Sequence, residues 1–199
     1  MTFLGDVDVH DADHDSLSRL IAQASDPLGL KNQFLQRLSQ GSLTRDENPQ
    51  SHFCAFFAPF DPVAKQVFIG HHIKADRWLF NGGHLDQGET PLEAMKREMK
   101  EEWGEEIGPY MLLPEHLLTI TDIDSSVVSC RKHYDLWYFV QIDKNQFKPD
   151  EKKLAKEFHQ WGWKTEAQAK ALCRDQDVGE VLKMINGFIN SVRCKKLPQ

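Results

Sequence analysis

Residues 82–104 read GGHLDQGETPLEAMKREMKEEWG, and this stretch decides the fold of the chain. Its start is rich in glycine, which permits backbone angles that other residues avoid, so we expect a loop there. A helix should follow, because Thr90 suits an N-cap, Pro91 suits the first helical position and Glu93 stands where a capping box places a glutamate. Gly104 has the residue type of a C-cap, so we expect the helix to end there.

Three glutamates of this helix, Glu98, Glu101 and Glu102, stand at positions i, i+3 and i+4 and therefore share one face. Carboxylates this close repel one another unless a cation lies among them. Mg²⁺ takes oxygen ligands and suits phosphate chemistry. Residues 86–106 hold eight acids and three bases, a net charge of −5, and the whole chain has a net charge of −6. Nearly all of the net charge therefore lies in this one stretch. On the glutamate spacing alone, the alternative to a metal site is a solvated acidic helix face.

The whole stretch resembles the Nudix box. Gly83 is followed after five residues by Glu89, and Glu89 after seven residues by the run Arg-Glu-Met-Lys-Glu-Glu-Trp-Gly at 97–104. Every fixed position of that motif is met up to Gly104, and the chain departs from it only at the next position, ordinarily apolar, which is Glu105. The resemblance implies an α/β fold, an α/β/α sandwich with a mixed sheet. It also implies a pyrophosphohydrolase that cleaves a nucleoside diphosphate linked to another moiety.

The resemblance also assigns the metal ligands. It implies that Glu98, Glu101 and Glu102 hold Mg²⁺, with the carbonyl of Gly83 as a further ligand. Mn²⁺ is the alternative ion, since carboxylates do not separate the two. Either Glu101 or Glu102 could serve as the general base.

Other box residues are assigned supporting roles. Arg97 belongs to the expected catalytic group, and we expect it to pair with Glu89 and fix the loop against the helix. Glu157, which matches a late strand of the family, is a candidate second base or ligand, with Glu151 as an alternative and a solvated surface acid as the simpler interpretation. The expected structural residues of the box are Gly82, Glu89 and Gly104.

Substrate recognition depends on aromatic side chains that stack on bases and on groups that bind phosphate or hydroxyls. For the aromatic candidates, packing in the core is the alternative role. The candidate substrate-binding residues are His84, Trp78, Phe80, His133 and Asp135, with Trp137, His72 and Arg131 as further members of the pocket.

The rest of the chain suggests an N-terminal helical extension and linker, residues 1–50, and a Nudix domain, residues 51–199. In the extension we expect two short helices, one with Leu17 and Ile21 on its apolar face and one within 28–38. The acidic start, with His10, Asp11, Asp13, His14 and Asp15, is either a metal cluster or a polar lead-in in which Asp15 or Ser16 caps the first helix.

Apolar and β-branched runs predict the strands, and caps and amphipathic spacing predict the later helices. We expect a charged loop over 144–156, a helix that begins after Thr165 and a terminal helix over 178–192. The expected strands are 52–60, 66–72, 78–80, 117–122, 133–142 and 161–163.

Composition excludes several classes. The charge of −6 argues against a nucleic-acid partner, and no apolar run approaches the length that spans a membrane. The four cysteines lack zinc-motif spacing, which favours free thiols in a reducing compartment, and the start does not read as a signal peptide. We therefore expect a cytoplasmic protein with a small nucleotide-diphosphate substrate, and the family implies a homodimer as one arrangement.

Three other functions stay open from sequence. A nucleotide sensor usually loses box carboxylates, whereas this chain keeps them all. An isoprenoid-diphosphate isomerase shares the fold and would need a positioned cysteine, for which Cys54 is the candidate. An enzyme that acts on RNA caps or dinucleoside polyphosphates ranks below one for small nucleotides, because the acidic chain offers RNA no evident track.

Overall fold

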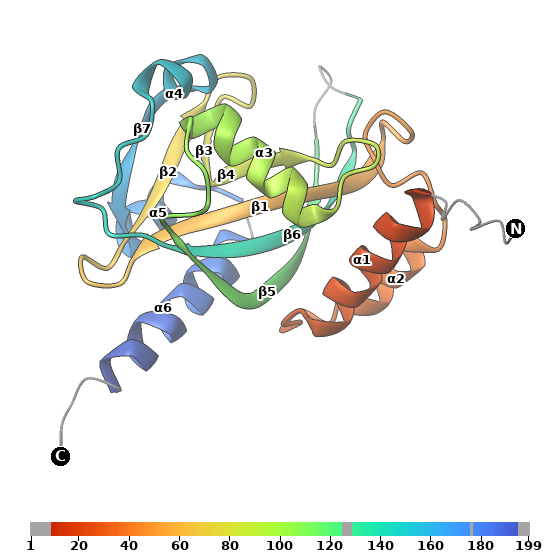
Figure 1. Cartoon of the computed structure of the whole chain (residues 1–199), viewed down its shortest axis with the longest axis horizontal. Helices are drawn as coiled ribbons and strands as arrows, with labels where there is room; N and C mark the ends of the chain where they lie inside the picture. Colours follow the sequence, from red (N-terminus) through yellow and green to blue (C-terminus); the bar gives the residue numbers. More distant parts are fainter. Residues whose placement is uncertain (1–8, 125–128, 176, 195–199) are drawn as a thin grey trace, which may run out of the picture.

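The computed structural model describes residues 9–124, 129–175 and 177–194. Its centre is a mixed sheet whose described part has seven strands (Figure 1). β1 and β6 run parallel, and the other pairs are antiparallel. The main path is β3 (Arg77–Leu79), β2 (Gln66–His72), β1 (Ser51–Asp61), β6 (Lys132–Gln141) and β5 (Met111–Asp122), while β4 (Asn81–His84) pairs with β1 and β7 (Phe158–Thr165) pairs with β2.

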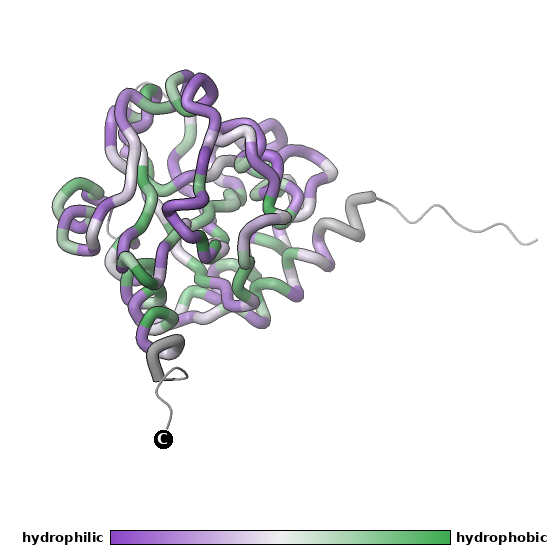
Figure 2. The backbone as a smooth tube through the Cα atoms, turned by 60° about the vertical axis from the view of Figure 1, so that its left-hand side comes forward, coloured by the Kyte–Doolittle hydropathy of each residue, from purple (hydrophilic) through white to green (hydrophobic). Residues whose placement is uncertain are grey.

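Helices cover both faces of this sheet, and each face has its own apolar core. One core joins α1 (Val9–Gln23), α2 (Lys31–Leu38), α3 (Pro91–Trp103) and α4 (Glu151–Glu157) to the sheet. The other joins α5 (Glu166–Leu172) and α6 (Val178–Cys194) to the opposite face. In Figure 2, hydrophobic stretches run through the strands in the middle and along the helices below, and hydrophilic stretches dominate the loops at the upper edge. The predicted α/β/α sandwich is confirmed.

The N-terminal helices pack on the sheet through Leu17, Ile21 and Phe34, which are fully buried. α1 begins at Val9, so the prediction that Asp15 or Ser16 caps it is wrong, since both lie inside the helix. The side chains of His10, Asp11 and Asp13, named above as a metal cluster, lie outside the described residues. The division into residues 1–50 and 51–199 stays a prediction.

Two loop predictions are also wrong. Gly82 and Gly83 lie in β4, where Gly82 pairs with Phe56 of β1. A Cβ at Gly82 would stand 2.4 Å from the carbonyl oxygen of Ala55, so glycine allows an approach that other residues would block. The segment 144–156 contains most of α4, which begins where the Asp150 side chain accepts a hydrogen bond from the backbone N–H of Lys152.

The other elements are close to where the sequence predicts them, but β5 is extended to begin at Met111 and the strand predicted over 161–163 is extended to Phe158–Thr165. No described helix is long and apolar enough to cross a membrane. Of the four cysteines, Cys54, Cys130 and Cys173 are free and buried, as expected, and the side chain of Cys194 lies outside the described residues.

Candidate active site

The site is built on α3, whose two ends are capped as the sequence predicts. The hydroxyl of Thr90 accepts from the backbone N–H of Glu93, and the Glu93 carboxylate accepts from the backbone N–H of Thr90 at 2.9 Å. Gly104 ends the helix in the left-handed conformation, with φ 73°. These caps set which residues face β4, so they fix the direction of the three glutamates.

Glu98 lies directly against the backbone of Gly83. A Cβ at Gly83 would stand 2.1 Å from Glu98 Oε1, so only glycine leaves room for the carboxylate. The same carboxylate accepts a hydrogen bond from Arg97 Nη1 at 2.8 Å. Burial raises the pKa of Glu98 and outweighs the lowering by Arg97. The close approach brings the Gly83 backbone and one carboxylate to a common point.

Glu102 is the most buried acid of the site, with 4% of its surface exposed. Asn81 Nδ2 donates to Glu102 Oε2 at 2.6 Å, which fixes the carboxylate next to β4. Burial raises the pKa of Glu102 well above its usual range, and the charges of Glu98 and Glu157 raise it further. Asn81 Oδ1 is buried with no partner among the described residues. Asn81 is not among the site residues predicted from the sequence, although it stands immediately before the two glycines.

Arg97 holds the loop that precedes α3. Its Nε and Nη2 bond the two oxygens of Glu89 at 2.8 and 3.0 Å, and Nη2 also donates to the carbonyl of His84 at 2.9 Å. Asp86 and Glu101 lie within 3.4 and 3.5 Å of the same guanidinium. The bidentate bond to Glu89 raises the pKa of Arg97. The guanidinium therefore ties loop, helix and β4 together.

Two further acids flank these residues. The side chain of Glu101 is 60% exposed on the same face of α3. Glu157, at the end of α4, has Oε2 3.8 Å from both His72 Nε2 and Lys74 Nζ. Glu157 is close enough for its charge to raise the pKa of Glu102, whereas Glu151 lies in the first turn of α4 with its side chain exposed.

This donor set fits a hard divalent cation. All the converging groups are oxygens, and they include the unpartnered Asn81 Oδ1 beside Glu102. Glu98 and Glu102 both disfavour ionisation when no cation is near, because they are buried and repel each other. Oxygen ligands that carry several negative charges are what Mg²⁺ and Mn²⁺ prefer.

The aromatic substrate candidates separate into two groups. Phe80 is buried beneath the α5–α6 face and meets Trp137 edge-on at 5.6 Å, so its role here is core packing. Trp78 is half-buried at the sheet edge, with Lys164 Nζ 5.2 Å from its ring centre. Of these three, only Trp78 is partly open to solvent.

The polar candidates also lie in different surroundings. Asp135 is buried and accepts a hydrogen bond from Thr121 at 2.6 Å, and burial raises its pKa to about 7. His84 and His133 are half-buried and lie together, with ring centres 5.0 Å apart. Burial lowers the pKa of His84 to about 3 and that of His133 to about 4, so both rings are neutral at pH 7.

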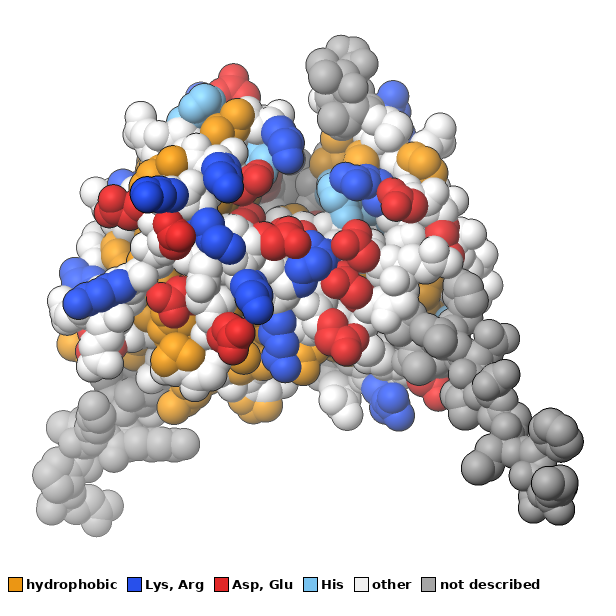
Figure 3. Space-filling model, turned by 45° about the horizontal axis from the view of Figure 1, so that its top comes forward, with side chains coloured by type: hydrophobic (Ala, Val, Ile, Leu, Met, Phe, Trp, Pro, Cys, Tyr) orange, Lys and Arg blue, Asp and Glu red, His pale blue; other side chains and the backbone are white. Residues whose placement is uncertain are grey.

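A pocket of about 840 Å³ opens beside these histidines. Its basic members, Arg45, Lys74 and Arg77, make it suitable for an anionic ligand. In Figure 3, acidic and basic side chains alternate over the face above α3 and histidine side chains lie around a hollow. The residues that line this pocket are Arg45, His72, Lys74, Ala75, Arg77, His84, Ile123, Asp124, Ser129, Cys130 and His133.

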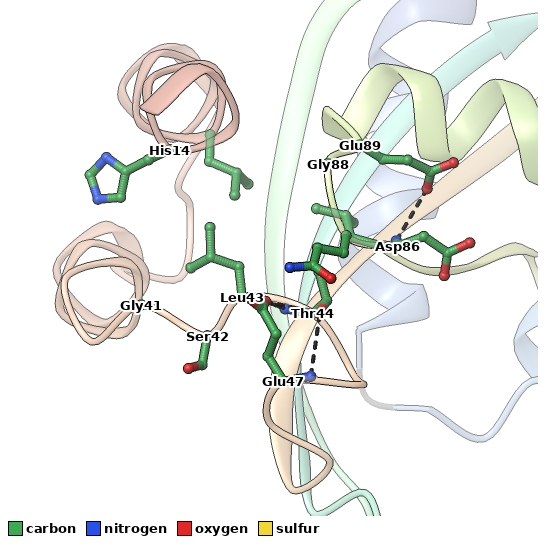
Figure 4. Close-up of a pocket in the computed structure, with 12 residues that line it drawn as sticks. His14, Gly41, Ser42, Leu43, Thr44, Glu47, Asp86, Gly88 and Glu89 are labelled. Atoms are coloured by element: carbon green, nitrogen blue, oxygen red, sulfur yellow. Dashed lines mark hydrogen bonds between the residues drawn. The ribbon is translucent and has the colours of Figure 1, made fainter. Parts of the chain in front are cut away.

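A second pocket, of about 240 Å³, lies between the linker at residues 41–47 and the loop at 85–89 (Figure 4). Glu89 turns back within that loop to accept from the backbone N–H of Asp86 at 3.1 Å. On the linker side of the pocket, the carboxylate of Glu47 accepts a hydrogen bond from the backbone N–H of Thr44 at 3.0 Å. The pocket therefore lies where the N-terminal segment faces the loop that precedes α3.

A family model described as the NUDIX domain matches residues 39–184, most of the chain. The chain belongs to the Nudix family. The predicted resemblance is therefore confirmed. Members of this family hydrolyse pyrophosphate bonds, so the prediction of a Nudix-type pyrophosphohydrolase is confirmed at the level of the family. They generally use a divalent metal and act on small nucleotides.

The curated relatives that match this chain share about a third of the aligned residues with it. An RNA pyrophosphohydrolase of Xylella fastidiosa strain Temecula1 is 29% identical over 138 residues, 55% of this chain and 68% of the relative. That of strain 9a5c is 33% identical over 114 residues, 49% of this chain and 56% of the relative. The match to these curated relatives thus spans between about half and two thirds of their length.

Solved structures show the same fold. An Ap4A hydrolase of C. elegans superposes with a TM-score of 0.55 at 16% identity, covering 69% of this chain and 97% of that one. The dihydroneopterin triphosphate pyrophosphohydrolase of E. coli superposes with a TM-score of 0.54 at 17% identity, covering 66% and 92%. At these identities the structures establish architecture and leave the substrate to be argued from the site.

Proposed function

We propose that this chain hydrolyses the pyrophosphate bond of a small nucleoside diphosphate linked to another moiety. The observation that carries the proposal is the contact of Glu98 with the Gly83 backbone beside the buried Glu102. Mg²⁺, or Mn²⁺ in its place, would be held by Glu98, Glu101, Glu102 and the Gly83 carbonyl. When bound, the cation neutralises phosphate charge and lowers the pKa of a coordinated water.

The chain's own residues do the rest by positioning. Asn81 holds the Glu102 carboxylate at 2.6 Å, and Arg97 keeps the Gly83–His84 backbone against α3. Phosphoryl transfer depends on such fixed geometry more than on covalent chemistry. Glu101, the most open of the three acids, is placed to accept a proton, and Glu157 is a candidate second base across the site.

Recognition of the substrate would fall to the basic pocket. Arg45, Lys74 and Arg77 provide positive charge for phosphate oxygens. Trp78 does not line this pocket, and its half-buried ring stays a candidate for stacking on a base. Phe80 and Asp135 are each 1% exposed and line a separate pocket of about 50 Å³, so they stay candidates outside the basic pocket.

The structure speaks against the isomerase alternative. Cys54 is 1% exposed, and burial raises the pKa of its thiol well above the usual range. A thiol kept neutral and away from solvent is poorly placed for acid–base work on an isoprenoid. The nucleotide sensor differs from the enzyme only in turnover, so experiment decides between them.

The test is release of nucleoside monophosphate or phosphate across a panel, each with Mg²⁺, Mn²⁺ or EDTA. The panel holds nucleoside triphosphates, ADP-ribose, nucleotide sugars, NADH, dinucleoside polyphosphates and, because of the relatives' names, an RNA with a 5′-triphosphate. We expect metal-dependent cleavage of one small-nucleotide class. Tight nucleotide binding with no turnover anywhere would overturn the proposal and favour the sensor.

A further inference from the structure

Four nitrogen and sulfur groups from separate segments meet at one end of the sheet. They are His52 of β1, His84 of β4, Cys130 of the segment before β6, and His133 of β6. One ligand atom from each lies within 4.8 Å of all the others. The strand register produces this meeting, because His52 pairs with His133, and His84 pairs with Cys54, two residues after His52.

The ring nitrogens are oriented as metal ligands are. His52 Nδ1 lies 2.9 Å from the carbonyl oxygen of Asn48 and donates its proton there. That bond leaves the lone pair of His52 Nε2 directed toward Cys130 Sγ, 3.7 Å away. A carbonyl or carboxylate that accepts the other ring N–H, and so fixes the tautomer, accompanies most histidine ligands of metals.

The other two histidines are left unsatisfied. His84 Nε2 and His133 Nε2 are buried and have no hydrogen-bond partner among the described residues. An unpaired buried polar atom destabilises the fold, because it has lost its hydrogen bonds to water. The three rings nevertheless stay close, with centres 4.7 to 5.0 Å apart. A shared ligand would satisfy both nitrogens.

The distances suit a tetrahedral ion. A zinc ion with nitrogen ligands at about 2.0–2.1 Å and sulfur at about 2.3 Å has nitrogen–sulfur edges of about 3.6 Å. The His52–Cys130 separation of 3.7 Å already matches such an edge. The other ligand atoms, all within 4.8 Å of one another, would have to move closer together when an ion binds.

We propose that His52, His84, Cys130 and His133 form a structural zinc site. Imidazole and thiolate select zinc over Mg²⁺, which takes oxygen ligands. Four protein ligands fill a tetrahedron and leave no open position for a substrate, so the site acts by holding structure. It ties Asn48 of the linker, β1, β4 and the start of β6 together, and it anchors His84 next to Gly83 of the hydrolytic site.

A phosphate-binding role for the histidines is the competing interpretation, because His84 and His133 also line the basic pocket. A thiol among the ligands argues against it, since Cys130 adds nothing to phosphate binding but completes a soft metal site. A surface group, His71, Asp76 and His159, is a matched control of similar composition without a thiol.

The experiment measures metal in the full chain. The protein is purified without chelator and dialysed, and zinc is counted by mass spectrometry; cobalt is then exchanged in and its spectrum recorded. The variants are Cys130→Ser and His133→Ala, with Cys173→Ser and His159→Ala as controls, and Glu98→Gln to separate this site from the hydrolytic one.

We expect one zinc per chain and a thiolate-to-cobalt charge-transfer band. Cys130→Ser should abolish the band, and Cys130→Ser and His133→Ala should each weaken zinc binding at least about tenfold, while Cys173→Ser, His159→Ala and Glu98→Gln keep both the band and the zinc. Wild-type protein that takes up no stoichiometric zinc overturns the proposal, whatever the variants do. Zinc bound equally by wild type and Cys130→Ser overturns it too. Neither result bears on hydrolysis, which is measured separately.

Discussion

Gly83 and His84 are neighbours on β4, yet they belong to different kinds of site. On the Gly83 side, carboxylates of one helix converge on the backbone, and every donor is an oxygen. On the His84 side, three imidazoles and a thiol come from β1, β4, the segment before β6 and β6 itself. The first site is local in sequence, with its glutamates within one helical turn. The second exists only because the sheet has a particular register.

The difference shows what each site needs from the fold. A helix presents Glu98, Glu101 and Glu102 together by its own periodicity, so the acidic site requires only that β4 approach α3. The histidine–cysteine cluster depends on strand pairs that bring His52 beside His133. A shift of one residue in the register of β1 and β6 would turn these side chains to the other face of the sheet and separate the residues of the cluster. The two sites can therefore be broken independently.

The largest expected effect comes from Glu98→Gln. Loss of a charged ligand should lower kcat by roughly 10²–10³-fold, the scale for one electrostatic contact to the transition state, while zinc content is unchanged. Steady-state kinetics in Mg²⁺ measures it, with Glu106→Gln, an exposed residue past the end of α3, as control. Full activity in Glu98→Gln would contradict the assignment.

Gly83→Ala should have the next largest effect. The added Cβ would stand 2.1 Å from Glu98 Oε1 and displace the carboxylate, and a displacement of about 1 Å can cost roughly 10²-fold in rate. Gly108→Ala is the control, because no atom lies within 4 Å of its added Cβ. Equal kcat in both variants would show that the Gly83–Glu98 contact does not matter.

The sequence predicted the caps of α3 and the shared face of its glutamates, but it did not predict that His84 and His133 meet His52 and Cys130, for a physical reason. The capping box, the C-cap and the glutamate spacing are local properties of α3, which the sequence states directly. The cluster joins residues 52 and 133, and no local pattern encodes that pairing. β4 was missed because glycine disfavours strands unless a neighbouring backbone approaches closely, as Ala55 does here.

Smaller errors have similar causes. α4 is short and charged, and only its cap at Asp150 distinguishes it from a loop. Asn81 precedes the glycines and carried no motif of its own, so its bond to buried Glu102 emerges only from the packing of β4 on α3. Phe80 and Asp135 have chemically suitable side chains, but the sequence does not show how deeply the fold buries them.

Arg97→Lys should have a moderate effect on kcat and should disturb β4 beside both sites. Lysine cannot make the bidentate bond to Glu89 together with the bond to the His84 carbonyl, so β4 loosens beside both sites. We expect kcat to fall about tenfold or more, the scale for lost supporting bonds. Arg19→Lys, an exposed position in α1, serves as control. An unchanged kcat would mean that Arg97 does not position the site.

The smallest effect is expected from Thr90→Ala. Loss of the N-cap should lower the free energy of unfolding by about 1 kcal/mol, with kcat nearly unchanged. Urea unfolding measures it. Thr165→Ala removes the same capping box from α5, away from both sites, and should cost a similar amount. A large loss of kcat in Thr90→Ala alone would show that the cap also sets catalytic geometry.

The most direct test of two separate sites is Mn²⁺ binding to zinc-loaded protein. The binding is measured from the loss of the electron paramagnetic resonance signal of free Mn²⁺. We predict that zinc-loaded wild type still binds Mn²⁺, that Glu98→Gln loses this binding, and that Cys130→Ser keeps it. Zinc that blocks Mn²⁺ with one-to-one stoichiometry, or Mn²⁺ binding untouched by Glu98→Gln, would contradict the account.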